Sequence, residues 1–166
     1  STEFIIGDGH QVLFKTSLPF GSVTYNRQFF SSLPLQQLDF DDAKQQVLTA
    51  LAEHRQTLRD LGWHCVVGAS GAVQSVVEVL LHRGLSETIT LDVLTQLKAE
   101  ILAQEDIGLT GIAGLCSERA PTFAAGVAIL LALFELLGIE HLALSGGALR
   151  EGVLVMLAQR IIDEVS

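Results

Sequence analysis

The sequence predicts an α/β domain in which helices flank a mixed sheet. Two apolar stretches, WHCVVG at 63–68 and HLALS at 141–145, each lead into glycines and then into a helical pattern. This order is typical of buried strands in sheets that are at least partly parallel. The first twenty residues predict a hairpin instead, with strands at 2–7 and 11–20 around an Asp8-Gly9 turn. The 166 residues are enough for one domain with a sizeable core.

Helical patterns account for most of the remaining chain. Apolar residues recur at helical spacing over 39–61, 72–82, 91–104 and 121–137. Thr90 is placed to cap the third of these helices, and Gly138 follows the fourth, where a glycine commonly ends a helix. The fourth helix is apolar nearly all round, so we expect it at the centre of the domain. The last residues predict an amphipathic helix over about 149–162.

The charge balance argues against two classes of binding surface. The chain carries 10 Lys and Arg against 19 Asp and Glu, a net charge of −9. This argues against general binding to nucleic acid or to anionic membranes.

The longest apolar run, at 123–134, is too short to span a bilayer and suits a buried helix. Cys65 lies within WHCVVG and is interpreted as a buried thiol in a reducing compartment.

Glycine-rich turns are the candidate ligand sites. GASGAV at 68–73 and SGGALREG at 145–152 each follow a predicted strand, and the chain begins on what looks like the exit of a third such turn. Glycine lets a backbone approach a ligand closely, and a following helix offers free N–H groups to an anion. Each turn alone is also explained as a tight connection. The five histidines (10, 54, 64, 82, 141) lack metal-ligand spacing, and the acids at 39–42 are expected to begin a helix.

Five motifs, in order along the chain, carry a resemblance to one family. LALSGGALREG resembles the last glycine motif of the exopolyphosphatase/guanosine pentaphosphate phosphohydrolase family. Ser1-Thr2-Glu3 matches the end of that family's phosphate-loop motif, Asp-Ile-Gly-Gly-(Gly/Ala)-Ser-Thr-Glu. GWHCVVGASGAVQ at 62–74 is similar to its inner strand and turn. TITLDVLTQLKAE at 88–100 and SERAPTFAAGVAILLALFELLGI at 117–139 continue the match, which covers essentially the whole chain.

The resemblance implies a ribonuclease H-like fold of the actin–hexokinase–Hsp70 superfamily. Residues 1–166 would form a single domain, the second, C-terminal actin-like half of a two-domain phosphatase. The chain would begin inside the phosphate loop. The first domain, which supplies another phosphate loop and the catalytic acid in this family, is expected to be absent. We therefore expect this half alone to be inactive.

The resemblance also implies roles for individual residues. Glu3 matches the acid of the phosphate-loop motif and would be catalytic, holding a metal or positioning the attacking water. The alternative for Glu3 is an exposed acid at a strand edge. Ser1 matches the motif serine, whose hydroxyl and N–H would contact phosphate.

Further substrate contacts are implied later in the chain. Gly146 and Gly147 would let the backbone approach the substrate, or else form a plain strand-to-helix turn. Arg119 in SERAP matches an arginine at the family's cleft, and a guanidinium binds phosphate bidentately. The alternative for Arg119 is a pair with Glu118 or a helix-end contact. The possible cleft residues are Gly68, Ser70 and Gly71.

Members of this family release the terminal phosphate of inorganic polyphosphate, or convert guanosine pentaphosphate (pppGpp) to ppGpp, with a divalent metal that is usually Mg²⁺. From the resemblance we expect such a cytoplasmic hydrolase, a homodimer in its full form. The stretches at 62–71 and 146–152 look closer to the guanosine pentaphosphate branch. Two alternatives stay open. One is a module that binds a guanosine polyphosphate without hydrolysing it, and the other is half of an actin-fold sugar or acetate kinase.

Overall fold

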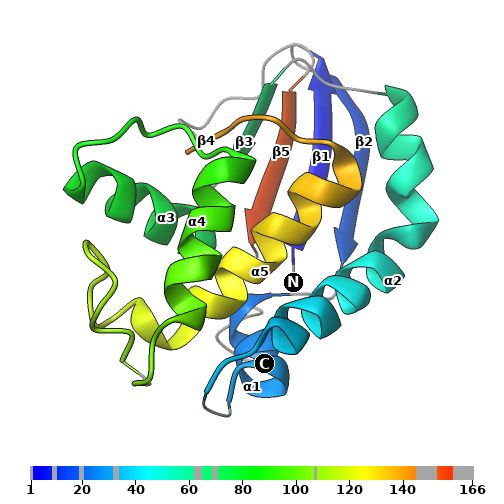
Figure 1. The fold of residues 1–166 in the computed structure, drawn as a ribbon. Helices are drawn as coiled ribbons and strands as arrows, with labels where there is room; N and C mark the ends of the chain where they lie inside the picture. Colours follow the sequence, from blue (N-terminus) through cyan, green and yellow to red (C-terminus); the bar gives the residue numbers. More distant parts are fainter. Residues whose placement is uncertain are drawn as a thin grey trace.

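The structure, a computed structural model, describes residues 2–8, 11–18, 21–31, 34–61, 65–68, 71–106, 108–144 and 153–158. For Ser22 and for the strands at 2–8, 11–18, 65–68 and 153–158 it describes the backbone alone. Figure 1 shows the arrangement of the helices and strands. In chain order they are β1 (Thr2–Asp8), β2 (Gln11–Leu18), α1 (Ser22–Phe29), α2 (Gln37–Leu61), β3 (Cys65–Gly68), α3 (Gly71–His82), α4 (Leu91–Leu102), α5 (Ala120–Leu137), β4 (Leu142–Leu144) and β5 (Val153–Ala158).

The five strands form one sheet in the order β2-β1-β5-β3-β4. β1 pairs antiparallel with β2, so the predicted hairpin strands are confirmed, with a register shift between Ile6 and Gly7. β1 also pairs antiparallel with β5, whereas β3 pairs parallel with both β5 and β4. Because of these directions, the amino end of β1 and the carboxyl ends of β3, β4 and β5 lie at the same edge of the sheet.

The helix predicted at 149–162 is wrong over Val153–Ala158, which form β5. The stretch VLVMLA is an uninterrupted apolar run, a pattern that buried strands and buried helices share. β5 is hydrogen-bonded to β1 on one side and to β3 on the other. Val155 of β5 lies opposite Ile5 of β1 and Val67 of β3. Both partner strands come from much earlier in the chain, so local periodicity carries no sign of the pairing. The other residues of the predicted helix lie outside the described part of the chain.

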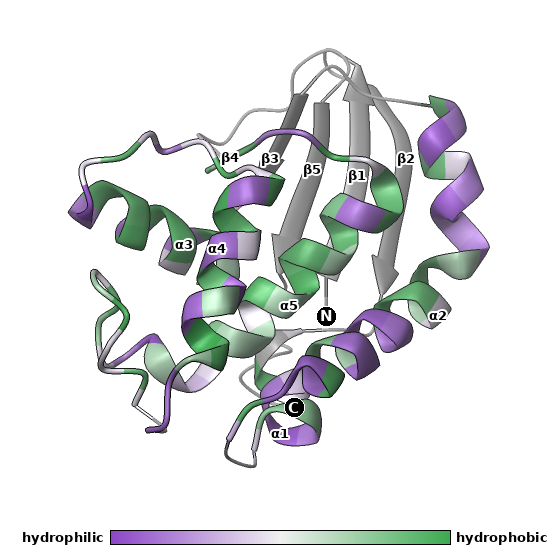
Figure 2. Ribbon diagram, viewed as in Figure 1, coloured by the Kyte–Doolittle hydropathy of each residue, from purple (hydrophilic) through white to green (hydrophobic). Residues whose placement is uncertain are grey.

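The helix α5 forms the centre of the helical layer, as its composition predicts. It contacts α1, α2, α3 and α4, and in Figure 1 it lies in front of the sheet. It is apolar along nearly its whole length (Figure 2), and most of its side chains are buried. By length and composition α5 could cross a membrane, but 83% of it is buried inside the domain. A helix buried in a core accounts for this composition.

The helix α2 shows the contrasting pattern, with one buried face and one polar face (Figure 2). The side chains that it buries are Phe40, Ala43, Val47, Leu51 and Leu58.

Two predicted helix ends are confirmed on other helices. The Thr90 hydroxyl accepts a hydrogen bond from the Val93 N–H at 3.3 Å and caps α4. Gly138 ends α5 in the left-handed region, with φ of 70°.

Arg83, just past the end of α3, ties three segments together. Its Nε donates to the Ala113 carbonyl at 2.9 Å, and its two terminal nitrogens donate to the two carboxylate oxygens of Glu100 on α4 at 2.8 and 2.7 Å. These hydrogen bonds lower the pKa of the Glu100 carboxyl below its ordinary value and raise that of the Arg83 guanidinium. Nearby, the Gln104 side-chain oxygen accepts from the Gly111 N–H at 3.0 Å. The connection from α4 to α5 is thus held by side chains rather than by regular structure.

Candidate functional site

One edge of the sheet gathers several positions that the sequence singles out. Gly68, the last residue of β3, lies opposite Leu144, the last residue of β4. On its other side Gly68 lies opposite Met156 of β5. The next residue of β5, Leu157, lies opposite Glu3 of β1. Glu3 is therefore one register position and two strand spacings from Gly68, roughly 10 Å across the sheet.

This edge is where ligands bind in open α/β sheets, at the carboxyl ends of parallel strands. α3 starts at Gly71, three residues beyond Gly68. The pair Gly146 and Gly147 follows β4 in the sequence. The sheet thus brings the backbone of Glu3 and Gly68 to one edge, although the two residues are far apart in the chain.

Arg119 reaches the helix that follows Gly68 from the start of α5. It is the N-cap residue of α5, and its side chain extends to α3. Its Nη2 donates to the side-chain oxygen of Gln74 at 3.1 Å and lies 3.3 Å from a carboxylate oxygen of Glu78. Its Nη1 lies 3.6 Å from the point where a Cβ on Gly71 would stand. The acid that pairs with Arg119 is therefore Glu78, and not the neighbouring Glu118 that the sequence offered as an alternative.

The local sequence of α3 explains this contact. Gln74 and Glu78 are four residues apart, so they lie on one face of the helix. The opposite face is apolar and buried, with Val73, Val76 and Val77 in the core. Arg119 thus meets the polar face of α3 near its start. A guanidinium carries a positive charge and paired N–H donors, and both favour an anion.

Several predicted site residues lie outside what the structure describes. Ser1, Ser70, Gly146 and Gly147 are outside the described residues, and for Glu3 only the backbone is described. Of the possible cleft residues, Gly68 ends β3 and Gly71 begins α3. The contacts predicted for these residues with phosphate or metal stay predictions.

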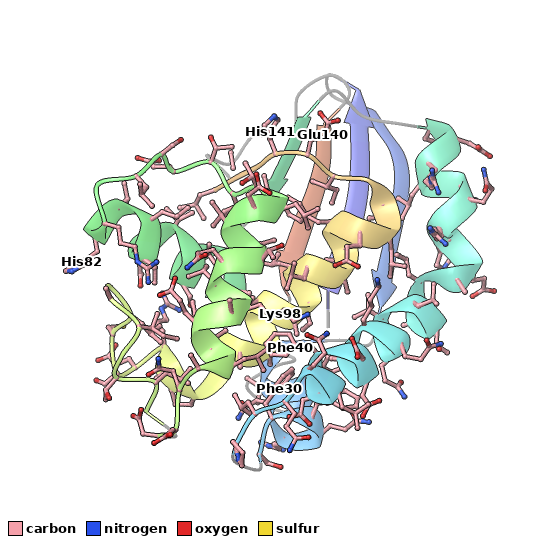
Figure 3. The ribbon with its side chains drawn as sticks, in the orientation of Figure 1. Phe30, Phe40, His82, Lys98, Glu140 and His141 are labelled. Carbon is pink, nitrogen blue, oxygen red and sulfur yellow. The ribbon has the colours of Figure 1, made fainter. Side chains whose placement is uncertain are left out.

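A separate cavity of about 130 Å³ opens between α2, α4 and α5. Lys98 of α4 stands over the Phe40 ring, 5.3 Å from its centroid, and Phe30 meets Phe40 edge to face (Figure 3). Lys44 pairs with Glu135 at the same cavity. Since Asp41 also lines it, its two lysines are balanced by two acids. The sequence did not predict this cavity, because its lining comes from three helices far apart in the chain.

The described side chains hold no group of three His, Cys, Asp or Glu that could bind a metal. The acids at 39–42 lie in the first turns of α2, as predicted, where the Asp39 carboxylate accepts from the Gln36 N–H at 2.8 Å. Sequence reasoning missed Gln74 and Glu78. Their spacing of four could have placed them on one helix face, but nothing local pointed to Arg119 as their partner.

Comparison with known proteins identifies the family. The profile of the Ppx/GppA phosphatase family matches residues 1–161. This chain belongs to the Ppx/GppA phosphatase family. The guanosine-5'-triphosphate,3'-diphosphate pyrophosphatase of Aliivibrio fischeri (strain MJ11) is 43% identical over 165 residues, which are 99% of this chain and 32% of that protein. The protein of the same name from Vibrio atlanticus (strain LGP32) is 40% identical over 164 residues, with the same coverage.

Solved structures of Ppx/GppA proteins share the fold. The Aquifex aeolicus PPX-GPPA enzyme superposes with a TM-score of 0.71 at 19% identity, over 90% of this chain and 51% of that chain. An exopolyphosphatase from Cytophaga hutchinsonii gives the same TM-score and identity, over 91% and 52%. The domain therefore has the actin-like fold of this family. The chain spans about a third of the length of the curated relatives named above.

Proposed function

We propose that this Ppx/GppA chain is the second, C-terminal actin-like half of a two-domain phosphatase. The complete protein would release the terminal phosphate of pppGpp, giving ppGpp, or of inorganic polyphosphate. The 43% identity to a guanosine-5'-triphosphate,3'-diphosphate pyrophosphatase, over nearly all of this chain, supports the pppGpp branch. The first domain would complete the cleft, so this half alone would be inactive.

The observation that carries the proposal is the shared sheet edge. Glu3, Gly68 and the end of β4 come to one edge, and Arg119 reaches the helix that follows Gly68. An acid, a glycine turn and an arginine are the groups that a phosphoanhydride hydrolase needs. The acid orients water, the glycines admit the phosphate chain and the arginine offsets its charge.

A divalent metal, Mg²⁺ by the family's usual preference, fits this donor set. Mg²⁺ binds through one or two carboxylates, phosphate oxygens and waters, so a single acid such as Glu3 at the edge suffices on the protein side. Bound there, the metal would neutralise charge on the transferred phosphate. Glu3 would hold it or orient the attacking water. Ser1 and the backbone at Gly146 and Gly147 would contact phosphate, with Arg119 as a further donor.

Phosphate release tests the proposal. The full-length protein that carries this sequence and the isolated chain are each incubated with pppGpp and with long polyphosphate, with Mg²⁺ or with EDTA. We expect release by the full-length protein only, with loss of release in EDTA. The faster substrate identifies the branch.

Glu3→Gln is the decisive variant, and Asp8→Asn, at the other end of the same strand, is its matched control. We expect Glu3→Gln to lower kcat by at least roughly a hundredfold and Asp8→Asn to leave it unchanged. Binding of pppGpp without release by the wild-type protein would favour the non-hydrolytic module. ATP-dependent transfer to a sugar or acetate would favour the kinase half.

The same proposal includes a homodimer in the cytoplasm. Removal of the first domain would uncover apolar surface, so the isolated chain should associate with itself. Light scattering at high protein concentration tests this, and a monodisperse monomer would contradict it.

A further inference from the structure

Among the described residues, the guanidinium of Arg119 uses only part of its hydrogen-bonding capacity. An arginine carries five N–H donors on three nitrogens. Both hydrogen bonds that Arg119 makes with described residues, to Gln74 and to Glu78, involve Nη2. Within the described part of the chain, the three N–H donors on Nε and Nη1 make no hydrogen bond. The Arg119 side chain is 30% exposed, so part of it is accessible to a ligand.

The two acceptors also fix the direction of the free donors. A guanidinium is planar, so holding both N–H groups of Nη2 sets the orientation of the whole group. Gln74 and Glu78 hold it from one face of α3, one helical turn apart. Nη1 then lies toward Gly71, where α3 begins. A side chain at position 71 would stand in van der Waals contact with Nη1, and glycine leaves that approach open.

We propose that Gln74 and Glu78 are positioning residues that hold Arg119 with Nη1 and Nε directed at the phosphate chain of the substrate. The inference rests on the proposed function and adds two residues to it. Neither Gln74 nor Glu78 would touch the substrate. Glu78, being negative, would even repel it, so its benefit must come through the arginine. Long flexible side chains lose conformational freedom when they bind, and an arginine held in place beforehand loses less.

Two variants of Glu78 in the full-length protein separate its role as a hydrogen-bond acceptor for Arg119 from its negative charge. Glu78→Ala removes the acceptor and frees the guanidinium, whereas Glu78→Gln keeps an acceptor oxygen and removes the charge. We expect Glu78→Ala to raise KM for pppGpp roughly fivefold to tenfold with kcat nearly unchanged. Glu78→Gln should restore most of the wild-type KM. Gln74→Ala should act in the same direction as Glu78→Ala, but less strongly.

The control variants isolate the coupling to Arg119. Glu87→Ala removes an exposed acid from the loop after α3 and should leave KM unchanged. Arg119→Ala should raise KM at least as much as Glu78→Ala. In the Arg119→Ala background, Glu78→Ala should have no further effect, because the residue it positions is gone. Thermal unfolding is measured for every variant, so a loss of folded protein is not counted as weaker binding.

A binding measurement keeps this inference distinct from the proposed hydrolysis. Calorimetric titration of the full-length protein with inorganic tripolyphosphate, in the absence of Mg²⁺, reports Arg119 contacts without turnover. Wild-type protein that binds but releases no phosphate would overturn the proposed function alone, and the Kd of Glu78→Ala would still decide the inference. The inference is overturned if Glu78→Ala behaves as Glu87→Ala in both KM and Kd. It is also overturned if the effects of Glu78→Ala and Arg119→Ala simply add.

Discussion

Two arginines lie at opposite ends of α3 and are used in different ways. Arg83, past the last turn, has all three of its side-chain nitrogens bonded to the protein, two to Glu100 and one to the Ala113 carbonyl. Arg119, beside the first turn, makes its hydrogen bonds with described residues through Nη2 alone. The comparison teaches that the number of occupied donors, and not the presence of a salt bridge, separates a structural arginine from one available to an anion.

Both arginines contact α3 or the residues that follow it. Displacing that helix should therefore cause the largest loss of stability. A Cβ on Gly126 of α5 would lie 2.9 Å from the Cβ of Ala72 on α3. We expect Gly126→Ala to force the two helices apart and to destabilise the domain by roughly 2 kcal/mol. Ala72→Gly in the same chain should recover much of that loss, since it removes the clashing atom. Urea unfolding of the two single variants and the double variant measures this, and equal midpoints for wild type and Gly126→Ala would refute it.

Substitution of Arg83 by lysine should cause the next largest loss of stability, and it should leave substrate binding unchanged. Lysine keeps the charge but cannot reach both Glu100 oxygens and the Ala113 carbonyl together. We expect a loss of about 1.5 kcal/mol in the free energy of unfolding with KM for phosphate substrates unchanged. Arg119→Lys should give the reverse, a raised KM with little change in stability. If both substitutions raised KM, or both lowered the free energy of unfolding, the distinction between the two arginines would be wrong.

The pH dependence of stability should report the Arg83 pair specifically. The folded-state pKa of Glu100 is lowered, chiefly by its hydrogen bonds from Arg83. The contribution of the pair is therefore present above the ordinary pKa of 4.5 and is lost as the pH falls through the folded-state pKa. At neutral pH we expect Glu100→Gln to cost about 1 kcal/mol. The difference in unfolding free energy between wild type and Glu100→Gln should shrink as the pH falls below 4.5 and through the folded-state pKa of Glu100. Unfolding midpoints at several pH values test this, and a gap independent of pH would contradict it.

The smallest effect should come from the start of α4, the helix that carries Glu100. The Thr90 hydroxyl satisfies one N–H of its first turn at 3.3 Å. Because that bond is long, Thr90→Ala should cost only about 0.5–1 kcal/mol, and Thr90→Ser should cost less. Differential scanning calorimetry of the two variants measures the difference. The prediction fails if Thr90→Ser is as unstable as Thr90→Ala.

The sequence predicts the elements whose signals are local. The periodicity of α2 and α5, the Thr90 cap and the Gly138 terminus depend on neighbouring residues, and all appear in the structure. Glycine turns and motif order predict the family, which the match over residues 1–161 confirms. Contacts between residues far apart in the chain could not be predicted in this way. The pairing of β5 with β1, and the reach of Arg119 to Gln74 and Glu78, join segments with no local feature in common.

The late position of α5 in the chain has a consequence for how the protein is made. α5 contacts α1, α2, α3 and α4, and every one of these helices precedes it in the sequence. β5, which joins β1 to β3, comes later still. A ribosome therefore delivers four amphipathic helices and most of a sheet before it delivers the elements that unite them. Such partly made chains expose apolar surface. We expect this domain to fold only near the end of its synthesis and to depend on chaperones until then.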